Sequence, residues 1–505
     1  MFAGDNLRQM ANLAVIGAGL GGLSCAAQLV SQGHQVSIFE KESSAGGRAR
    51  RVSQETVNGT YLTEIGPTVF TMLDIAELPF QALETKMANH VEMIPVSPSY
   101  RGVFRDGTQI DWPNDPSQIF GTIESFAGTS QAEGFNKYVD WLEKLVKVEY
   151  DDFVAKNFSK TTDILDNPGA LIKLLQMGAF KKMDKKVSQF ISDQRLISMS
   201  TFQALYAGVT PAQALAVYCI ISYMDLVQGV FYPKGGMCVY GEKLADELLN
   251  AGVKIHYDTK VESVKKMSSK GIEITSSGIS ECFDAVVCNA DLPYSYPQIF
   301  GEEIPKKIAN AKYSPSCLIY VVGAKSSTGN SDPHHTIYFS QDDNASFDEL
   351  VKGKKMMTDP SYLISNPNQT DPGISPEGTN VFYVLEPSPH LDSNVDFENL
   401  REYHTDRMRG HLAKSGVELE RIDAEIFIDP NDWETRDMYK GTPFSLAHTF
   451  FQSGPFRPSN EHKSREGVFF CGTGTTPGVG IPMVIESGRL ASEKVSRYLR
   501  ESGKK

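Results

Sequence analysis

The sequence is short of several patterns that mark particular classes of protein. No window reaches the about 18 to 20 uninterrupted apolar residues that a transmembrane helix needs, so we expect no such helix. The first residues carry no secretory signal, because their apolar stretch is short and broken by glycine. Acidic residues outnumber basic ones, and the net charge of −13 argues against a general nucleic-acid binder, although it allows a local basic patch.

Paired cysteines and clustered histidines are also missing. The seven cysteines are dispersed and form no CxxC pair or zinc-ligand spacing, so we expect reduced, mostly buried thiols in a cytoplasmic protein. The ten histidines are scattered as well. Their one adjacent pair, His334-His335, would point to opposite faces of a strand, so the sequence predicts no metal site.

Alternating strand and helix patterns occur at three separated places in the 505 residues. We predict strands at residues 12–16, 35–39, 285–288 and 468–470, and helices at 23–32, 242–250 and 483–499. These pieces predict an α/β fold with a Rossmann-like domain that is discontinuous and consists of residues 10–70, 231–292 and 467–500. The inserted parts are a helical, membrane-associated region at 71–230 and a mixed α+β substrate domain at 293–466. The latter has strand patterns at 317–322, 336–340, 380–385 and 424–428 and a helix pattern at 396–415.

The helical region contains the most apolar helix pattern of the chain, at residues 211–226. It is either a buried core helix or the wall of an apolar cavity or lipid-facing surface, and these interpretations are compatible. Further helices are predicted at 135–149 and 167–180, the second with Asn167 as its N-cap. Four lysines lie close together and form either a solvated helix face or a contact for anionic lipid headgroups: Lys181, Lys182, Lys185 and Lys186.

A glycine motif follows the first predicted strand. In the GxGxxG pattern, Gly17 allows the tight turn, Gly19 lets the backbone approach a pyrophosphate, and Gly22 lets the helix pack on the strand. The N-terminus of that helix attracts phosphates. Glu40 ends the second strand about 20 residues on, where its carboxylate can accept hydrogen bonds from a ribose diol and would repel the 2′-phosphate of NADP. These residues alone do not separate NAD from FAD.

A second glycine pair extends the motif. Gly46-Gly47-Arg48 comes soon after Glu40, and the combination resembles the GxGxxG…E…GGR pattern of the flavin amine oxidase and carotenoid desaturase superfamily. In that superfamily the segment lies along the FAD pyrophosphate, so the resemblance implies FAD. From the residues alone, Arg48 and Arg50 are also compatible with solvated cations on a surface loop.

The far end of the chain carries a more specific signature. Residues 472–488 read GTGTTPGVGIPMVIESG and follow a predicted strand. This loop can direct a positive helix end at the flavin pyrimidine, or it is only a turn between strand and helix. Together with FQALYAG at 202–208, SYMD at 222–225 and YPKGGM at 232–237, it resembles the bacterial phytoene desaturase family along essentially the whole chain.

The resemblance implies which residues contact the cofactor and which are candidates for catalysis. The cofactor-binding set is Gly17, Ala18, Gly19, Gly21, Gly22, Glu40, Lys41, Gly47, Arg48, Gly66, Pro67, Thr68, Val261, Gly472, Gly480, Ile481 and Pro482. Residues 289–291 either pass the cofactor or form a capped strand end. Asp193 and Arg195 stand roughly where the family's acid/base carboxylate and arginine lie, and the alternative is a helix-surface pair. Asp225 is another carboxylate in apolar surroundings, which helix polarity alone would also explain.

The function implied by the resemblance is FAD-dependent desaturation of phytoene towards lycopene. Oxidised flavin accepts the hydride, and a protein base or the flavin takes the proton, so no catalytic triad or metal is needed. The alternatives are a hydroxycarotenoid or diapophytoene desaturase, an FAD-dependent carotenoid isomerase, and a non-redox lipid-binding protein of the same fold. The expected partners are the carotenoid, a membrane surface bound peripherally, and an electron acceptor such as quinone or oxygen, with no nucleic acid.

Overall fold

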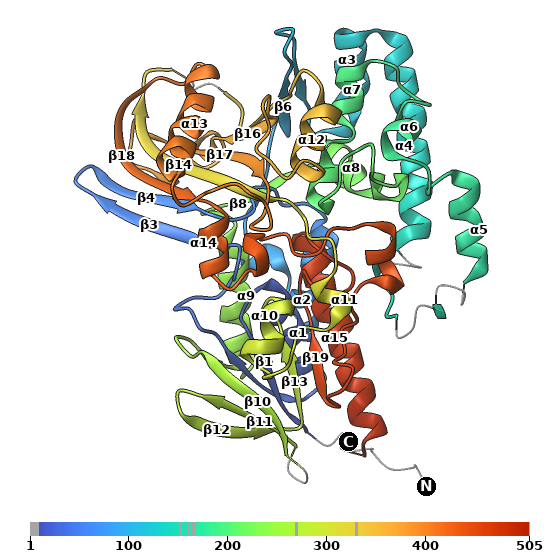
Figure 1. The fold of residues 1–505 in the computed structure, drawn as a ribbon, viewed down its shortest axis with the longest axis vertical. Helices are drawn as coiled ribbons and strands as arrows, with labels where there is room; N and C mark the ends of the chain where they lie inside the picture. The colour runs from blue at the N-terminus through green and yellow to red at the C-terminus, as the bar shows by residue number, and fades with distance from the viewer. Residues whose placement is uncertain are drawn as a thin grey trace.

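The computed structural model describes residues 10–150, 154–158, 162–163, 167–267, 271–328 and 332–503. In Figure 1 a five-stranded sheet with its covering helices forms the lower part of the molecule. A seven-stranded sheet lies above it, and a group of helices stands beside that second sheet. In the described part of the chain, no helix combines the length and the apolar character that crossing a bilayer requires.

The five-stranded sheet is parallel and takes its strands from three distant parts of the chain. Its order is β19 (Val468–Phe470), β13 (Ala285–Cys288), β1 (Asn12–Ile16), β2 (Gln35–Phe39) and β9 (Lys254–His256). Val15 is in register with Val287 on one side and with Ile38 on the other. The central strands are almost entirely buried, which explains why they are continuous apolar runs. Four of these five strands have the predicted bounds.

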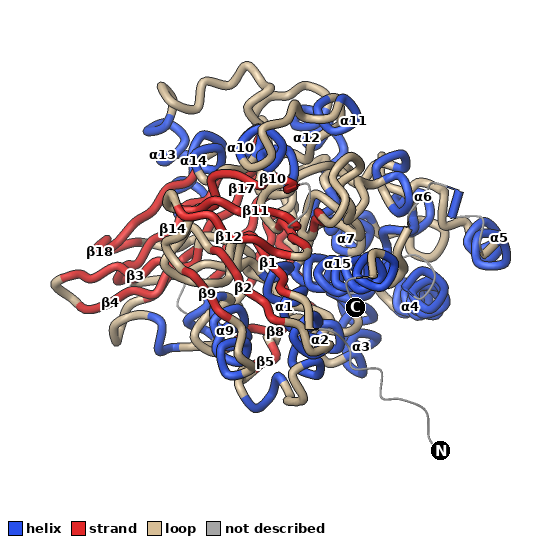
Figure 2. The backbone as a smooth tube through the Cα atoms, turned by 90° about the horizontal axis from the view of Figure 1, so that it is seen from below, coloured by secondary structure: helices blue, strands red, loops and turns tan. Residues whose placement is uncertain are grey.

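Successive residues of β1 enter two different cores. Leu13 and Val15 pack with helices α1 (Leu20–Ser31), α9 (Cys238–Asn250) and α15 (Ile481–Glu501). Ala14 and Ile16 pack on the opposite face, with the antiparallel strands β10 (Val261–Met267), β11 (Gly271–Ser276) and β12 (Ile279–Phe283) and with helix α10 (Leu292–Gln298). Figure 2 shows α1 and α15 lying side by side, so the N-terminal and C-terminal parts of the described chain cover the same face of the sheet.

The seven-stranded sheet combines the 293–466 region with two strands from much earlier in the chain. Its order is β18 (Leu419–Ile428), β14 (Ser316–Ser326), β17 (Asn380–Ser388), β16 (Tyr362–Ser365), β15 (His335–Tyr338), β6 (Tyr100–Val103) and β7 (Gln109–Trp112). The last two lie within the 71–230 region, where the sequence pattern predicts helices. Their pairing with β15 is non-local, with Thr336 in register with Arg101, and local patterns do not reveal such pairing.

Helices fill most of the remaining 71–230 region. They are α2 (Leu73–Ala82), α3 (Pro116–Ala127), α4 (Thr129–Glu149), α5 (Pro168–Met177), α6 (Met183–Val187), α7 (Gln194–Met199) and α8 (Cys219–Leu226), with 3₁₀ turns η4 (Phe202–Ala207) and η5 (Ala216–Tyr218). Asn167 caps α5 as predicted, because its side chain accepts a hydrogen bond from the Ala170 N–H.

Shorter elements connect these parts. The strands are β3 (Arg51–Thr56), β4 (Gly59–Glu64), β5 (Met93–Pro95) and β8 (Phe231–Pro233). The helices are α11 (Lys306–Ala309), α12 (Asp343–Val351), α13 (Arg401–Lys414) and α14 (Pro430–Thr435). The 3₁₀ turns are η1 (Met87–Asn89), η6 (Pro367–Gln369), η7 (Pro372–Ile374), η8 (Tyr439–Gly441), η9 (Phe450–Gln452) and η10 (Gly454–Phe456).

The prediction of one long helix over 211–226 is wrong. Only residues 216–226 are helical, as the turn η5 followed by α8. The Ala216 N–H donates to the Lys181 carbonyl and the Val217 N–H to the Ala179 carbonyl. Because these N–H groups pair with another segment, they are not free to continue a helix backwards through residues 211–215.

Candidate functional site

A cavity of about 710 Å³ lies between the two sheets. Its wall includes the glycine turn after β1, the loop after β2, and the loop that leads into α15. It also includes apolar residues of the seven-stranded sheet, such as Ile319, Ile337 and Leu385. One connected space therefore joins the nucleotide-binding motifs to a largely apolar chamber.

Close backbone approach shapes the glycine turn at the start of α1. Gly17 has φ +96°, a conformation that favours glycine. A Cβ on Gly22 would lie 2.1 Å from the Gly17 carbonyl oxygen, so no side chain fits there. The second glycine pair lies against the first motif, because a Cβ on Gly47 would be 2.9 Å from the Cα of Gly19. The N–H groups of the first turn of α1 have no intrahelical partners and are left for a ligand.

Glu40 closes this turn from the end of β2. Its Oε2 accepts a hydrogen bond of 2.6 Å from the Ala18 N–H, and its Oε1 accepts one of 2.9 Å from the Glu42 N–H. Burial raises the pKa of the carboxyl group, and these two hydrogen bonds oppose that rise. Glu40 also lines the cavity, so it can position the backbone and still present its carboxylate to a bound diol.

Arg48 links the N-terminal and C-terminal segments. Its Nη1 donates to the Thr473 hydroxyl at 2.6 Å, and its Nη2 lies 3.4 Å from the Asp291 carboxylate. Burial raises the pKa of Asp291 to about 6, although the Arg48 guanidinium opposes this rise. Oδ1 of Asp291 is buried and has no hydrogen-bond partner in the described structure. Arg50 instead pairs with Glu42 at 2.9 Å on the surface of the loop.

The loop before α15 presents a second helix N-terminus to the same cavity. Gly480 caps α15 with φ +111°, and Pro482 stands in the first turn of that helix. A Cβ built on Gly480 would meet no atom closer than 4.0 Å, so this stretch of backbone faces open space. The Gly472 N–H donates to the Ser487 hydroxyl at 3.0 Å, which attaches the loop to its helix.

Asn289 stands where the three distant segments meet. It follows β13, and Cβ atoms built on Gly19, Gly21 and Gly472 would all lie within 3.0 Å of its side-chain amide. Residues 289–291 line the cavity. The structure therefore places this strand end beside the nucleotide-binding motifs. This matches the interpretation in which residues 289–291 pass the cofactor.

These features fit a dinucleotide with an extended ring system. Two helix N-termini and the half-buried Arg48 supply positive partners for negatively charged groups, and the unpartnered Asp291 oxygen supplies an acceptor. All of the cofactor residues named from the sequence line the cavity except Ala18 and Gly22. Those two act on the turn itself, through the bond from Ala18 to Glu40 and through close helix packing at Gly22.

Asp193 and Arg195 lie elsewhere. Asp193 is the N-cap of α7 and accepts hydrogen bonds from the Arg195 and Leu196 N–H groups. Arg195 pairs with Asp193 at 2.6 Å and stacks on the Phe126 ring. Neither residue lines the cavity. The geometry matches the helix-surface pair, and the catalytic assignment stays a prediction without structural support.

Three polar residues in the cavity wall were not singled out from the sequence. Glu149 is buried at the end of α4 with Oε2 unpartnered, and burial raises its pKa well above the usual range. Tyr218 stacks on His448 with ring centroids 6.0 Å apart. Burial lowers the pKa of His448 well below its usual value, so the imidazole is neutral. Of the three, only Glu149 could have been recognised from the sequence. It continues the buried stripe of Leu142 and Leu145 at helical spacing.

Comparison with known proteins places this geometry among flavoenzymes. A family model described as flavin containing amine oxidoreductase matches residues 20–496. The phytoene dehydrogenase of Streptomyces griseus is 38% identical over 494 residues, covering 96% of this chain and 95% of that protein. The zeta-carotene-forming phytoene desaturase of Myxococcus xanthus is 32% identical, covering 97% and 95% respectively.

Solved structures show the same fold at low sequence identity. An oxidoreductase from Methanosarcina mazei superposes with a TM-score of 0.61 at 16% identity, covering 95% of this chain and 100% of that one. Cyclohexylamine oxidase from Brevibacterium oxydans superposes with a TM-score of 0.59 at 14% identity, covering 97% and 100%.

Proposed function

Because the chain belongs to the family of flavin-containing amine oxidoreductases, we propose that it is an FAD-dependent desaturase that introduces double bonds into phytoene towards lycopene. The family match confirms the resemblance found in the sequence, the cofactor FAD and the class of oxidoreductase. A family of oxidoreductases does not favour the alternative of a non-redox lipid-binding protein. The substrate and the direction of reaction are the proposal.

One observation carries the substrate proposal. The similarity to the phytoene dehydrogenase and the zeta-carotene-forming phytoene desaturase extends over nearly the whole chain, so it includes the chamber wall as well as the cofactor motifs. That wall is made mainly of aliphatic and aromatic side chains, among them Phe202, Leu205, Ile221 and Phe339. A long hydrocarbon needs such a surface, since it offers no hydrogen-bonding group.

The residues of the chain divide the work of catalysis between them. Bound FAD supplies the acceptor of the hydride that leaves the substrate. Arg48 and the N-terminus of α1 bind and orient phosphate groups, and Glu40 fixes the glycine turn while accepting from a ribose. The N-terminus of α15 stabilises negative charge on a bound ring system. The apolar wall excludes water from the reacting carbons.

Conversion of phytoene in a defined system tests the proposal. The purified protein, loaded with FAD, is incubated with phytoene in liposomes in the presence of oxygen and a quinone as electron acceptors, and the absorption spectrum of the extracted carotenoids is followed. We expect a red shift, because each added double bond lengthens the conjugated system. Yellow, FAD-loaded protein that leaves the spectrum unchanged would overturn the proposal for this substrate.

A second substrate deserves the same assay. A protein of Staphylococcus haemolyticus named 4,4′-diapophytoene desaturase (4,4′-diaponeurosporene-forming) is 29% identical over 499 residues. Offering phytoene and 4,4′-diapophytoene together shows which one the chain prefers. An isomerase would change the geometry of a carotenoid without consuming an electron acceptor, so omission of quinone and oxygen separates that alternative from desaturation.

We further propose that the protein docks on an anionic membrane surface at the helix α5. Ile172 and Leu175 of α5 are 53% and 59% exposed, and Phe451 of η9 is 71% exposed. The neighbouring residues Leu174 and Phe450 line the cavity, so this apolar surface adjoins the route into the chamber. Lys181, Lys182 and Lys185 are exposed after α5 and complement anionic headgroups, in a chain of net charge −13. Lys186 is not part of this surface, because it is buried over the Trp141 ring.

Flotation with vesicles tests the docking surface. We expect the protein to float with anionic vesicles, and Leu175→Ser combined with Phe451→Ser to weaken that binding several-fold. Ile279→Ser is the matched control, because Ile279 is 65% exposed on the hairpin of β11 and β12. Equal loss of binding in the control and the double variant would contradict the assignment of this face.

A further inference from the structure

Asp225 is a buried carboxyl group in the apolar chamber. It is 2% exposed, lies on α8 and lines the cavity. Its Oδ2 accepts a hydrogen bond of 3.1 Å from the Tyr100 hydroxyl on β6. Tyr206 of η4 lines the cavity beside them, and its hydroxyl interacts with that of Tyr100. Three separate elements thus bring one acid and two phenols together at a wall that is mainly apolar.

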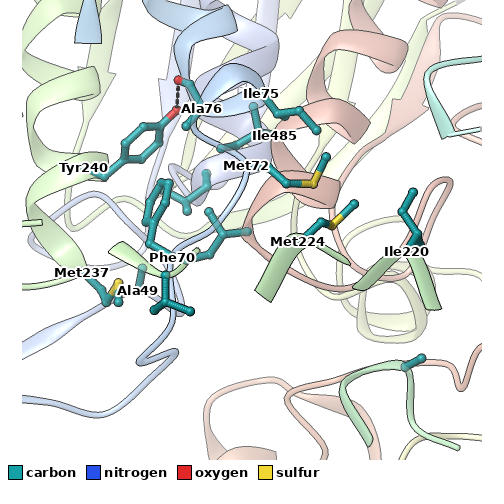
Figure 3. Packing of buried hydrophobic residues seen from close by; sticks show 14 of the residues in the cluster. Ala49, Phe70, Met72, Ile75, Ala76, Ile220, Met224, Met237, Tyr240 and Ile485 are labelled. Atoms are coloured by element: carbon teal, nitrogen blue, oxygen red, sulfur yellow. Dashed lines mark hydrogen bonds between the residues drawn. The ribbon is translucent and has the colours of Figure 1, made fainter. Parts of the chain in front are cut away.

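Contacts place Asp225 near the segments that surround the cofactor site. The Tyr100 ring is 5.5 Å from the His335 ring, and Nε2 of His335 lies 3.1 Å from the Thr68 carbonyl oxygen. Thr68 belongs to the cofactor-binding set. Figure 3 shows the neighbour of Asp225, Met224, beside Met72 and facing the same core as Ile485 of α15. Met224, on the helix that carries Asp225, therefore packs beside Met72, which belongs to the segment after β4.

The reaction proposed above needs a proton acceptor as well as a hydride acceptor. One C–H bond loses its electron pair with the hydride, which reduces the flavin by two electrons. The C–H bond on the adjacent carbon loses only a proton, and its electron pair becomes the new π bond. A carboxylate that touches the substrate can take that proton and return it to solvent or to the reduced flavin between turnovers.

We propose that Asp225 is the catalytic residue that accepts this proton, and that Tyr100 and Tyr206 position it. The inference rests on the proposed desaturase function. A hydrocarbon substrate does not itself require a buried acid in the chamber, and an acid without a basic partner is costly to keep there. A role in proton transfer would explain why a carboxyl group is buried in the chamber wall.

The surroundings of Asp225 suit a base that works near neutral pH. Burial raises its pKa to about 7, and the hydrogen bond from Tyr100 opposes the rise. The titratable groups that face it are the two tyrosines, and no lysine, arginine or histidine pairs with it in the described part of the chain. The carboxylate is the form that accepts a proton, so its fraction increases as the pH rises through 7.

Substitution of Asp225 tests the proposal in the FAD-loaded protein. We expect Asp225→Asn to lower kcat by about 100-fold or more while flavin content and phytoene binding stay unchanged. Asp225→Glu keeps the acid and should recover part of the rate. In the wild type, kcat should rise with pH around 7, and this rise should be absent from the remaining activity of Asp225→Asn.

A second variant and a spectroscopic measurement keep the test independent of folding losses. Tyr100→Phe removes the hydrogen bond that favours the carboxylate, so the rise in kcat should move to higher pH by roughly half a unit to one unit. Infrared difference spectra of the flavin-free protein should show the C=O band of a buried carboxylic acid that disappears around pH 7. That band should be missing from Asp225→Asn.

The outcomes separate this inference from the proposed function. Wild-type protein that desaturates no carotenoid would overturn the proposed function, and the role of Asp225 with it. Active wild type with an equally active Asp225→Asn, or with an unchanged pH profile in Asp225→Asn, would overturn the role of Asp225 alone. Loss of rate without the infrared band near pH 7 would also overturn it, because the residue would then not titrate in the required range.

Discussion

At the scale of single residues, Glu40 has two tasks. It holds the Ala18 and Glu42 N–H groups and also faces the cavity. Glu40→Gln removes the charge that strengthens hydrogen bonds to a ribose, and it sets an amide NH2 against one of the two backbone N–H groups that the carboxylate accepts from. We expect the affinity for FAD to fall about 10- to 100-fold, which quenching of flavin fluorescence measures.

Glu420→Gln is the control for this prediction, because Glu420 is exposed, pairs with Lys325 and does not line the cavity. Its affinity for FAD should stay within about twofold of wild type, since an exposed ion pair contributes little. Similar losses in both variants would show that a general change of charge, and not the Glu40 carboxylate, controls binding.

Glu64 makes the stability of the fold depend on pH. It accepts hydrogen bonds from the Met237 and Cys238 N–H groups, and burial raises its pKa to about 8. A raised pKa means that the folded state keeps a proton that the unfolded state releases. The contribution of the protonated Glu64 side chain to the free energy of unfolding is complete below about pH 4.5 and is lost as the pH rises towards 8.

Glu64→Gln removes that titration. The melting temperature of the wild type should therefore fall relative to the variant between about pH 5 and pH 8, by the equivalent of about 3 kcal/mol. Thermal unfolding of both proteins across this range measures the difference. A constant difference between them would mean that Glu64 has the same pKa in both states.

The residues that sequence patterns identified are those whose neighbours are close in the chain. The roles of Gly17, Gly22 and Glu40 follow from one strand–turn–helix unit, so their spacing was sufficient. Asp225, Tyr218 and His448 come together only when separate elements pack, and no local spacing records that. For Asp193 a motif-based analogy suggested catalysis; the structure shows its side chain capping α7, and the catalytic assignment stays a prediction.

At the scale of elements, the contact between α1 and α15 depends on Gly488. A Cβ at this position would lie 2.3 Å from the Gly21 carbonyl oxygen and 2.8 Å from the Cys25 nitrogen. Gly488→Ala should therefore separate the two helices, destabilise the protein by more than about 2 kcal/mol and reduce bound flavin. Thermal unfolding and the flavin absorbance per protein measure both effects.

Gly410 offers the matched control within a helix. A Cβ there would meet nothing within 4 Å in the middle of α13. Gly410→Ala should raise stability by about 0.5 to 1 kcal/mol through helix propensity. If Gly488→Ala behaved in the same way, the close packing of α1 on α15 would not constrain that position.

Helices and strands were predictable from the sequence where a local pattern alone determines them. The apolar runs of the parallel sheet and the Asn167 cap of α5 carry such signals. The strands β6 and β7 and the start of the 211–226 segment do not, because their backbone groups pair with residues that are remote in sequence. Tertiary pairing overrides local propensity at these places.

At the scale of the whole molecule, bound cofactor should stabilise the fold, because it contacts chain segments that are far apart in the sequence. The cavity takes wall residues from the first 50 residues, from 259–261 and from 472–484. A ligand that binds the folded state alone stabilises it by about 2.7 kcal/mol at 100 times its Kd. We expect FAD to raise the melting temperature of the flavin-free protein by several degrees and AMP to raise it less.

Differential scanning fluorimetry with a series of concentrations checks this prediction. AMP occupies only the nucleotide end, so it cannot reach the loop at 472–480. An equal shift with AMP and with FAD would show that the C-terminal loop does not contribute to cofactor binding.

The parallel sheet has a consequence for how the protein is made. Ribosomes add about 5 to 20 residues per second. The last strand, β19, pairs with β13, and between Cys288 of β13 and Val468 of β19 synthesis takes roughly 9 to 36 seconds. Throughout that interval the nascent chain exposes the edge that β19 will cover and lacks the helix α15. Chaperones that bind exposed apolar edges should therefore associate with the nascent chain until its last strand emerges.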